Sequence, residues 1–132
     1  MTFDPQAIFA NLTEKERVHG HHTAEGRAIR TLCRSLQGWW SGDLGAIDIF
    51  AMCDQAIEDW LKSRLKISPW SATGSSQLLA AAVATKLLTP AESLRLQTVH
   101  DLRSRSATDA IAAHDVEAAL AWSIEVVERH WS

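Results

Sequence analysis

The sequence predicts an all-α protein, an up-and-down bundle of four to five helices. Apolar residues recur at helical spacing along most of the chain, and no stretch sustains the alternation of apolar and polar residues that is typical of a strand. Ala and Leu are abundant, whereas only six Gly and three Pro occur. A length of 132 residues favours one domain, so we expect residues 1–132 to form a single helical bundle.

The first helical region is predicted from about Pro5 to Trp40. Asp4 is suited to cap it, because its carboxylate can accept backbone N–H groups, and proline is well tolerated at the first helical position. Gly20 and Gly26 weaken the middle of this region, which is therefore either two helices or one bent helix.

The clearest helix is expected over residues 44–66, with Asp43 as its cap and an end before Pro69. Four acidic residues precede the basic residues of its last turns, an order that matches the helix dipole. We therefore expect these acidic residues on the solvent face: Asp48, Asp54, Glu58 and Asp59. The apolar face comprises Ala46, Ile49, Phe50, Cys53, Ile57, Trp60 and Leu61.

Three further helices are predicted over residues 75–88, 90–106 and 115–130, after an exposed loop at residues 71–76. Thr89 followed by Pro90 is typical of a helix start, and Asp115 is suited to cap the last helix.

Composition limits the class of protein. The net charge of −3 provides no overall basic field, although a local basic patch is compatible with it. Cys33 and Cys53 lie among apolar residues and are expected to be buried free thiols. We expect no signal peptide and no membrane span, and therefore a soluble cytoplasmic protein that needs no cofactor.

Six tryptophans also bear on assembly. Trp60, Trp122 and Trp131 fall on or beside apolar stripes and are expected to pack in the core or at an interface. Trp39 and Trp40 are adjacent and cannot both face one core, so one of them is expected to meet a loop or a partner chain. In a homodimer this tryptophan would pack against the partner chain.

Basic and hydroxyl side chains gather where the helix at 90–106 gives way to the helix at 115–130. They form either a solvated helix end or an anion site built from guanidinium groups and hydroxyls. We call this set the basic corner: Arg103, Ser104, Arg105, Ser106 and Thr108.

Residues 43–130 resemble HEPN domains, helical bundles found in prokaryotic toxins, RNA-processing systems and nucleotidyltransferase partners. GDLGAIDIFAMCDQAIEDWLKSRL is similar to the second helix of that family, with its acidic-then-lysine pattern at Glu58 to Lys62. LRSRSATDA followed by HDVEAALAWSIEVVERH is similar to its arginine-containing corner and final helix. The resemblance implies a homodimer that acts with RNA or with a partner protein such as a nucleotidyltransferase, as in a toxin–antitoxin pair.

Active members of that family cleave RNA with an Arg and a His about five residues later. Here Arg103 takes the place of that Arg, but Thr108 stands where the His is expected, and threonine cannot transfer protons near neutral pH. We therefore expect a non-catalytic binding or regulatory module. The alternative is a metal-independent ribonuclease that uses Arg95 and His100, an R-x4-H segment in which Leu96 replaces the usual polar residue, or Arg103 with a His from elsewhere.

A third hypothesis is a metal site on the first helical region. Glu16, His19 and His22 follow one another at a spacing of three, and Glu-x-x-His is a spacing that helical bundles use to present metal ligands. Further ligands would come from Glu58, His100 or His114. The alternative for this segment is a polar surface, exposed or facing a dimer partner.

Overall fold

A computed structural model describes residues 4–19, 23–68, 70–105 and 113–129 of the chain. Within these ranges the protein is all-α and contains no strand, which confirms the predicted fold class. The described residues form six helices rather than the expected four to five: α1 (Pro5–His19), α2 (Ala24–Ser41), α3 (Ala46–Arg64), α4 (Ser75–Ala84), α5 (Pro90–Arg105) and α6 (Ala113–Arg129).

The first helical region is two helices, because each has its own cap. The Asp4 carboxylate accepts the backbone N–H groups of Gln6 at 3.2 Å and Ala7 at 3.3 Å at the start of α1. The Thr23 hydroxyl accepts the Gly26 N–H at 2.9 Å at the start of α2. A second cap inside the region therefore begins a second helix.

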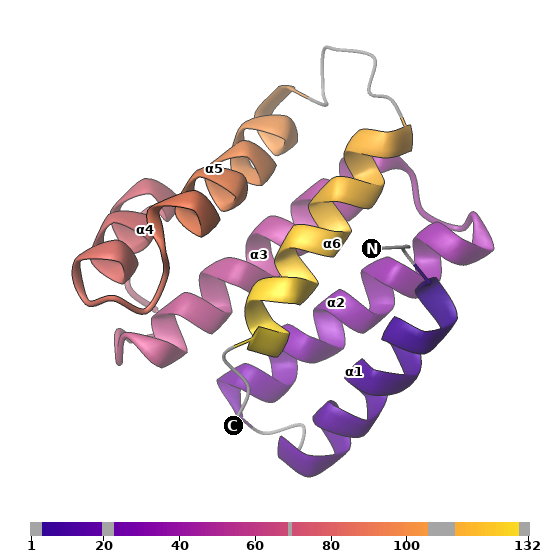
Figure 1. Cartoon of the computed structure of the whole chain (residues 1–132), viewed down its shortest axis with the longest axis horizontal. Coiled ribbons are helices and arrows are strands. Elements are labelled where there is room, and N and C mark those ends of the chain that lie inside the picture. Colours follow the sequence, from indigo (N-terminus) through magenta and orange to yellow (C-terminus); the bar gives the residue numbers. More distant parts are fainter. Residues whose placement is uncertain (1–3, 20–22, 69, 106–112, 130–132) are drawn as a thin grey trace.

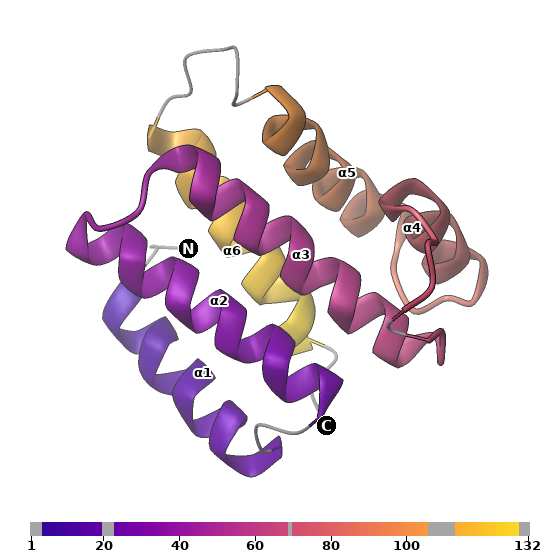
Figure 2. The ribbon, with the colours of Figure 1, turned by 180° about the vertical axis from the view of Figure 1, so that it is seen from behind.

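Helix α3 is the centre of the packing, since it contacts α2, α4, α5 and α6. Figures 1 and 2 show α1, α2 and α3 side by side, with α6 across α2 and α3 on one face and with α4 and α5 along the far side of α3. The C-terminal end of α5 and the N-terminal end of α6 lie at the same end of the molecule.

Two predicted caps are wrong. The N-cap of α3 is Gly45, because the Asp43 carboxylate instead accepts the Ser41 hydroxyl at 2.9 Å. Helix α6 already begins at Ala113, so Asp115 lies in its first turn, where its charge still suits the helix dipole. Helix α3 ends at Arg64 rather than Lys66, since Lys66 has a left-handed φ of 58° that cannot continue a helix.

The core is formed mainly by the inner faces of α2, α3 and α6. Trp60 is fully buried, as expected, and Trp122 is partly buried against the core. The adjacent tryptophans divide as predicted: Trp39 packs against the core, while Trp40 keeps 49% of its surface exposed. Trp131 lies outside the described residues.

None of the described helices combines the length and apolar character needed to cross a membrane.

Both cysteines are buried free thiols, as the sequence predicts. Burial raises the pKa of Cys53 to about 12, although the neighbouring hydroxyls of Ser35 and Ser123 act in the opposite direction. Burial and the nearby charge of Glu16 raise the pKa of Cys33 to about 11. Both thiols are therefore protonated near neutral pH.

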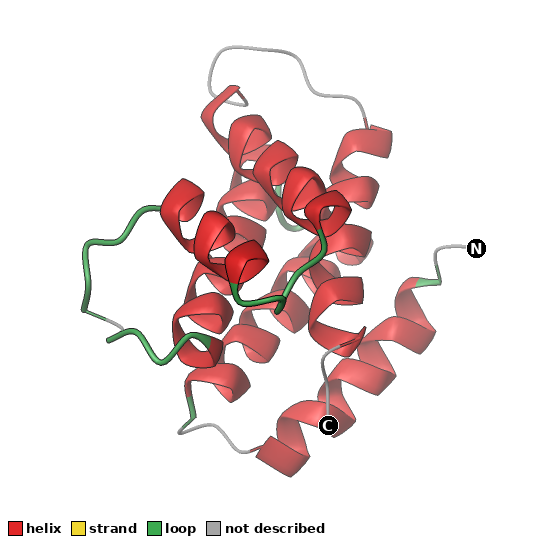
Figure 3. Cartoon of the chain, turned by 60° about the vertical axis from the view of Figure 1, so that its left-hand side comes forward, coloured by secondary structure: helices red, strands yellow, loops and turns green. Residues whose placement is uncertain are grey.

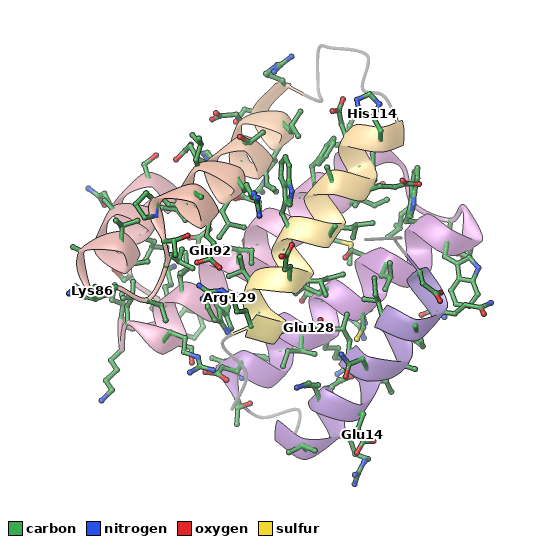
Figure 4. The ribbon with its side chains drawn as sticks, in the orientation of Figure 1. Glu14, Lys86, Glu92, His114, Glu128 and Arg129 are labelled. Carbon is green, nitrogen blue, oxygen red and sulfur yellow. The ribbon has the colours of Figure 1, made fainter. Side chains whose placement is uncertain are left out.

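Helix α5 begins as predicted at Thr89 and Pro90 and is tied to α6 by an ion pair. The Glu92 carboxylate accepts the Thr89 N–H at 2.9 Å, and the Thr89 hydroxyl accepts the Glu92 N–H at 3.2 Å. The same carboxylate accepts the Arg129 guanidinium, with an Nε–O distance of 2.6 Å (Figure 4). Burial acts to raise the pKa of Glu92, but hydrogen bonds from Arg129 and Thr89 outweigh it and lower that pKa.

Candidate anion-binding site

A buried carboxylate joins α3 to two basic side chains of α5. Asp54 accepts His100 through Nδ1 at 3.0 and 3.2 Å, and it accepts Arg103 through Nη1 at 2.8 Å. The Asp54 side chain is only 6% exposed, whereas His100 is 35% exposed and Arg103 is 41% exposed. We call these three residues the Asp54 cluster.

Helical geometry explains why the three residues meet. Asp54 stands four residues after Phe50 and three before Ile57, so it falls on the buried face of α3. His100 and Arg103 are three residues apart and therefore project from one face of α5, which packs on α3. The prediction that Asp54 lies on the solvent face is wrong, because charge-assisted hydrogen bonds from α5 compensate its burial.

The contact with Asp54 orients the His100 ring and indicates which ring nitrogen donates to the carboxylate. A carboxylate only accepts hydrogen bonds, so Nδ1 of His100 must carry the hydrogen that points at Asp54. The neutral ring then presents Nε2 as an acceptor. This is how a carboxylate orients a histidine that moves protons.

Arg103 belongs both to the Asp54 cluster and to the basic corner. Ser104 and Arg105 are exposed at the end of α5, and the Ser104 hydroxyl donates to the His100 carbonyl at 3.4 Å. Thr108 and Ser106 lie outside the described residues. The charge of Asp54 balances that of Arg103, and Arg105 adds a second guanidinium at the end of α5.

The structure brings His100 together with Arg103 and places Arg95 elsewhere. Arg95 lines a cavity of about 280 Å³ between α5 and α6, with Glu92, Trp122 and Arg129 among its neighbours. Residues five apart on a helix point in directions about 140° apart. The R-x4-H segment therefore does not present its two ends on one face of α5.

The structure describes only part of the proposed metal site on the first helical region. The Glu16 carboxylate lies 3.9 Å from Nε of Arg30, as part of the contact between α1 and α2. The His19 side chain and all of His22 lie outside what the structure describes. Among the residues whose positions are described, no three His, Cys, Asp or Glu side chains are arranged to hold a metal ion.

Asp54 is the site residue that the sequence analysis missed, and the sequence contained a signal for it. It is the one acidic position that coincides with the apolar face of α3, between Phe50 and Ile57. A carboxylate in such a position requires a basic partner on a neighbouring helix.

Comparison with known proteins gives no match for this chain. No family model matches the chain, no curated protein matches it in sequence, and no solved structure matches it in fold.

Proposed function

We propose that this chain is a HEPN-like, non-catalytic module that binds RNA phosphates at the end of α5. The observation that carries the proposal is the contact between Arg103 and Asp54 at 2.8 Å. This contact holds a guanidinium in one place while 41% of that side chain remains exposed. An arginine with a fixed position binds a phosphate oxygen at a lower entropic cost than a mobile one.

The neighbouring groups suit a phosphate rather than an apolar ligand. Arg105 adds a second guanidinium two residues later, and Ser104 adds an exposed hydroxyl. Helix α5 ends here, so the partial negative charge of its carbonyl ends competes for these cations. Binding is therefore expected to be moderate and strongly dependent on salt.

The test is binding of a fluorescent single-stranded RNA pool, followed by anisotropy in the presence of EDTA. Arg105→Gln removes one exposed charge without touching Asp54, and Arg103→Ala removes the anchored arginine. Arg34→Gln, at an exposed position on α2, is the matched control for loss of one charge. We expect both corner variants to bind several-fold more weakly and the control to bind like the unmodified protein. Unchanged binding by Arg103→Ala would refute the proposal.

A second candidate, a metal-independent ribonuclease, is favoured by the contact between His100 and Asp54. With Nδ1 donating to Asp54, Nε2 of the neutral ring can accept a proton beside the Arg103 guanidinium. Cleavage of the RNA pool in EDTA that is lost in His100→Ala and retained in His114→Ala would establish it. His114 is 82% exposed on α6, which makes it a suitable matched control. Intact RNA in every sample would contradict the ribonuclease and leave the non-catalytic binding module as the proposed function.

We also propose that the module is a homodimer. The alternative binding partner to RNA is a protein, such as a nucleotidyltransferase in a toxin–antitoxin pair. The support for a dimer is the exposure of Trp40, at 49%, and of Ile47, at 55%, near the connection between α2 and α3. Light scattering would show a mass near 29 kDa, twice the chain mass of 14.6 kDa. Trp40→Ser is expected to shift that mass toward the monomer.

A further inference from the structure

The cavity between α5 and α6 has a volume of about 280 Å³ and lies beside the ion pair of Glu92 and Arg129. The two helices contact each other and run in opposite directions, with the end of α5 and the start of α6 at the same end of the molecule (Figures 1 and 3). Sites for drug-sized ligands measure about 300–1,000 Å³. A ligand of this cavity must therefore be small.

Two side chains of opposite charge line this cavity from facing helices. Arg95 follows Glu92 by one helical turn on α5, and Glu125 precedes Arg129 by one turn on α6. Both are exposed, and within the described ranges neither side chain makes a hydrogen bond or an ion pair, with the other or with a third residue. The cavity therefore contains one guanidinium and one carboxylate that are both available to a ligand.

The apolar wall of the cavity belongs to α6. Trp122 and Val126 are four residues apart and therefore lie on the same face of the helix. Val126 is only 4% exposed, and Trp122 is partly buried against the core. These two side chains are held in place by packing, and they can cover a small apolar group of a ligand.

The charges of the cavity limit the class of ligand. Its charged residues are two carboxylates and two guanidinium groups, so their formal charges cancel: Glu92, Arg95, Glu125 and Arg129. A phosphate would lie close to two carboxylates, and a simple cation would lie close to two guanidinium groups. A ligand that carries both charges and no net charge avoids both repulsions.

We propose that this cavity binds a free α-amino acid with an apolar side chain. Its carboxylate would accept from the Arg95 guanidinium, which can donate two parallel hydrogen bonds. Its ammonium group would donate to the Glu125 carboxylate. Its side chain would pack against Trp122 and Val126. A ligand with a single charge would leave Arg95 or Glu125 without a partner, whereas an amino acid satisfies both.

The inference does not depend on RNA binding at the basic corner. The cavity lies beside the first two turns of α5, whereas the basic corner lies at the other end of that helix. Variants of the two sites can therefore be tested separately.

The experiment is a titration of the ¹⁵N-labelled full chain, followed by NMR, with three related ligands. Leucine carries both charges, N-acetylleucine lacks the ammonium group, and leucinamide lacks the carboxylate. A pH of about 6.5 keeps the free amino groups protonated. The indole N–H signal of Trp122, assigned by its loss in Trp122→Phe, reports on the cavity.

Four charge variants accompany the unmodified chain. Arg95→Gln removes the guanidinium, with Arg34→Gln at an exposed position on α2 as its control. Glu125→Gln removes the carboxylate, with Glu117→Gln at an exposed position on the same helix as its control.

We expect leucine to shift the Trp122 signal with a Kd in the millimolar range and to bind more tightly than the two derivatives. Arg95→Gln should weaken leucine and N-acetylleucine but leave leucinamide unchanged. Glu125→Gln should weaken leucine and leucinamide but leave N-acetylleucine unchanged. Each loss should be roughly 2- to 12-fold, the range that corresponds to one hydrogen bond, and both controls should bind leucine normally.

The proposal is overturned if the Trp122 signal does not move at about 20 mM leucine, well above a millimolar Kd. It is also overturned if Arg95→Gln and Glu125→Gln bind leucine as well as the unmodified chain does. Equal binding of all three ligands would contradict it too, because the two charges of the amino acid would then make no contact with the protein.

Discussion

Arg103→Ala should lower the stability of the fold much more than Arg105→Ala, although both remove an arginine from the end of α5. Arg103 donates at 2.8 Å to a carboxylate that is only 6% exposed, whereas Arg105 is exposed and does not contact Asp54 in this way. Hydrogen bonds to charged groups contribute about 1.5–3 kcal/mol. The guanidinium is 41% exposed, which reduces this range, so we expect a loss of about 2 kcal/mol for Arg103→Ala. The loss for Arg105→Ala should stay below about 1 kcal/mol, because the contacts of an exposed charged side chain contribute little.

Urea unfolding followed by circular dichroism measures both values. With a slope of about 2 kcal/mol per molar urea, the midpoint of Arg103→Ala should fall by about 1 M. In an Asp54→Asn background the same substitution should cost far less, because the buried charge that Arg103 compensates is gone. Equal midpoints for the two arginine variants, or equal costs in both backgrounds, would refute the reasoning about the Asp54 cluster.

Three further predictions concern packing, pH and thiol chemistry. A Cβ added at Gly38 would clash with the Leu44 side chain, so Gly38→Ala should destabilise the fold by about 1–3 kcal/mol. Urea unfolding should show this cost removed in a Leu44→Ala background, and its persistence there would contradict the packing argument. Glu92→Gln should cost about 1–2 kcal/mol at pH 7. Since the pKa of Glu92 is lowered in the fold, this advantage is complete above the ordinary value of 4.5 and is lost as the pH falls below it. A difference between the two proteins that is constant from pH 7 to pH 3 would contradict this. Cys33 and Cys53, with pKa values raised to about 11 and about 12, should not react with a thiol reagent at pH 8 in the folded state. Both should react in urea, and rapid reaction without urea would show that the thiols are accessible.

The helices could be predicted because their signals are local. Asp4 and Thr89 cap helices where the sequence placed the caps, and the apolar face of α3 is buried as its spacing indicates. The sequence predicted caps at Asp43 and Asp115, and neither residue is the N-cap of its helix. A carboxylate near a helix start has competing partners, and at Asp43 the Ser41 hydroxyl is the partner observed.

The candidate site could be predicted only in part, because it joins residues far apart in the sequence. Arg103 and His100 were both expected to matter, but in separate arrangements, and their common partner Asp54 lies more than forty residues away. The solvent-face prediction for Asp54 followed the charge order along α3 and neglected its position on the apolar face. The position of Asp54 on the apolar face predicts its burial, but its basic partners on α5 are set by a tertiary contact that no local pattern encodes.

The most direct test of RNA binding at the basic corner is the salt dependence of RNA affinity, measured by anisotropy for the unmodified chain and for Arg105→Gln. Each phosphate contact contributes about −0.7 to the slope of log affinity against log salt for single-stranded nucleic acid. The account predicts a shallower slope for Arg105→Gln by about that amount, with the slope of Arg34→Gln unchanged. Equal slopes for all three proteins would contradict it, because the exposed arginine at the end of α5 would then contact no phosphate.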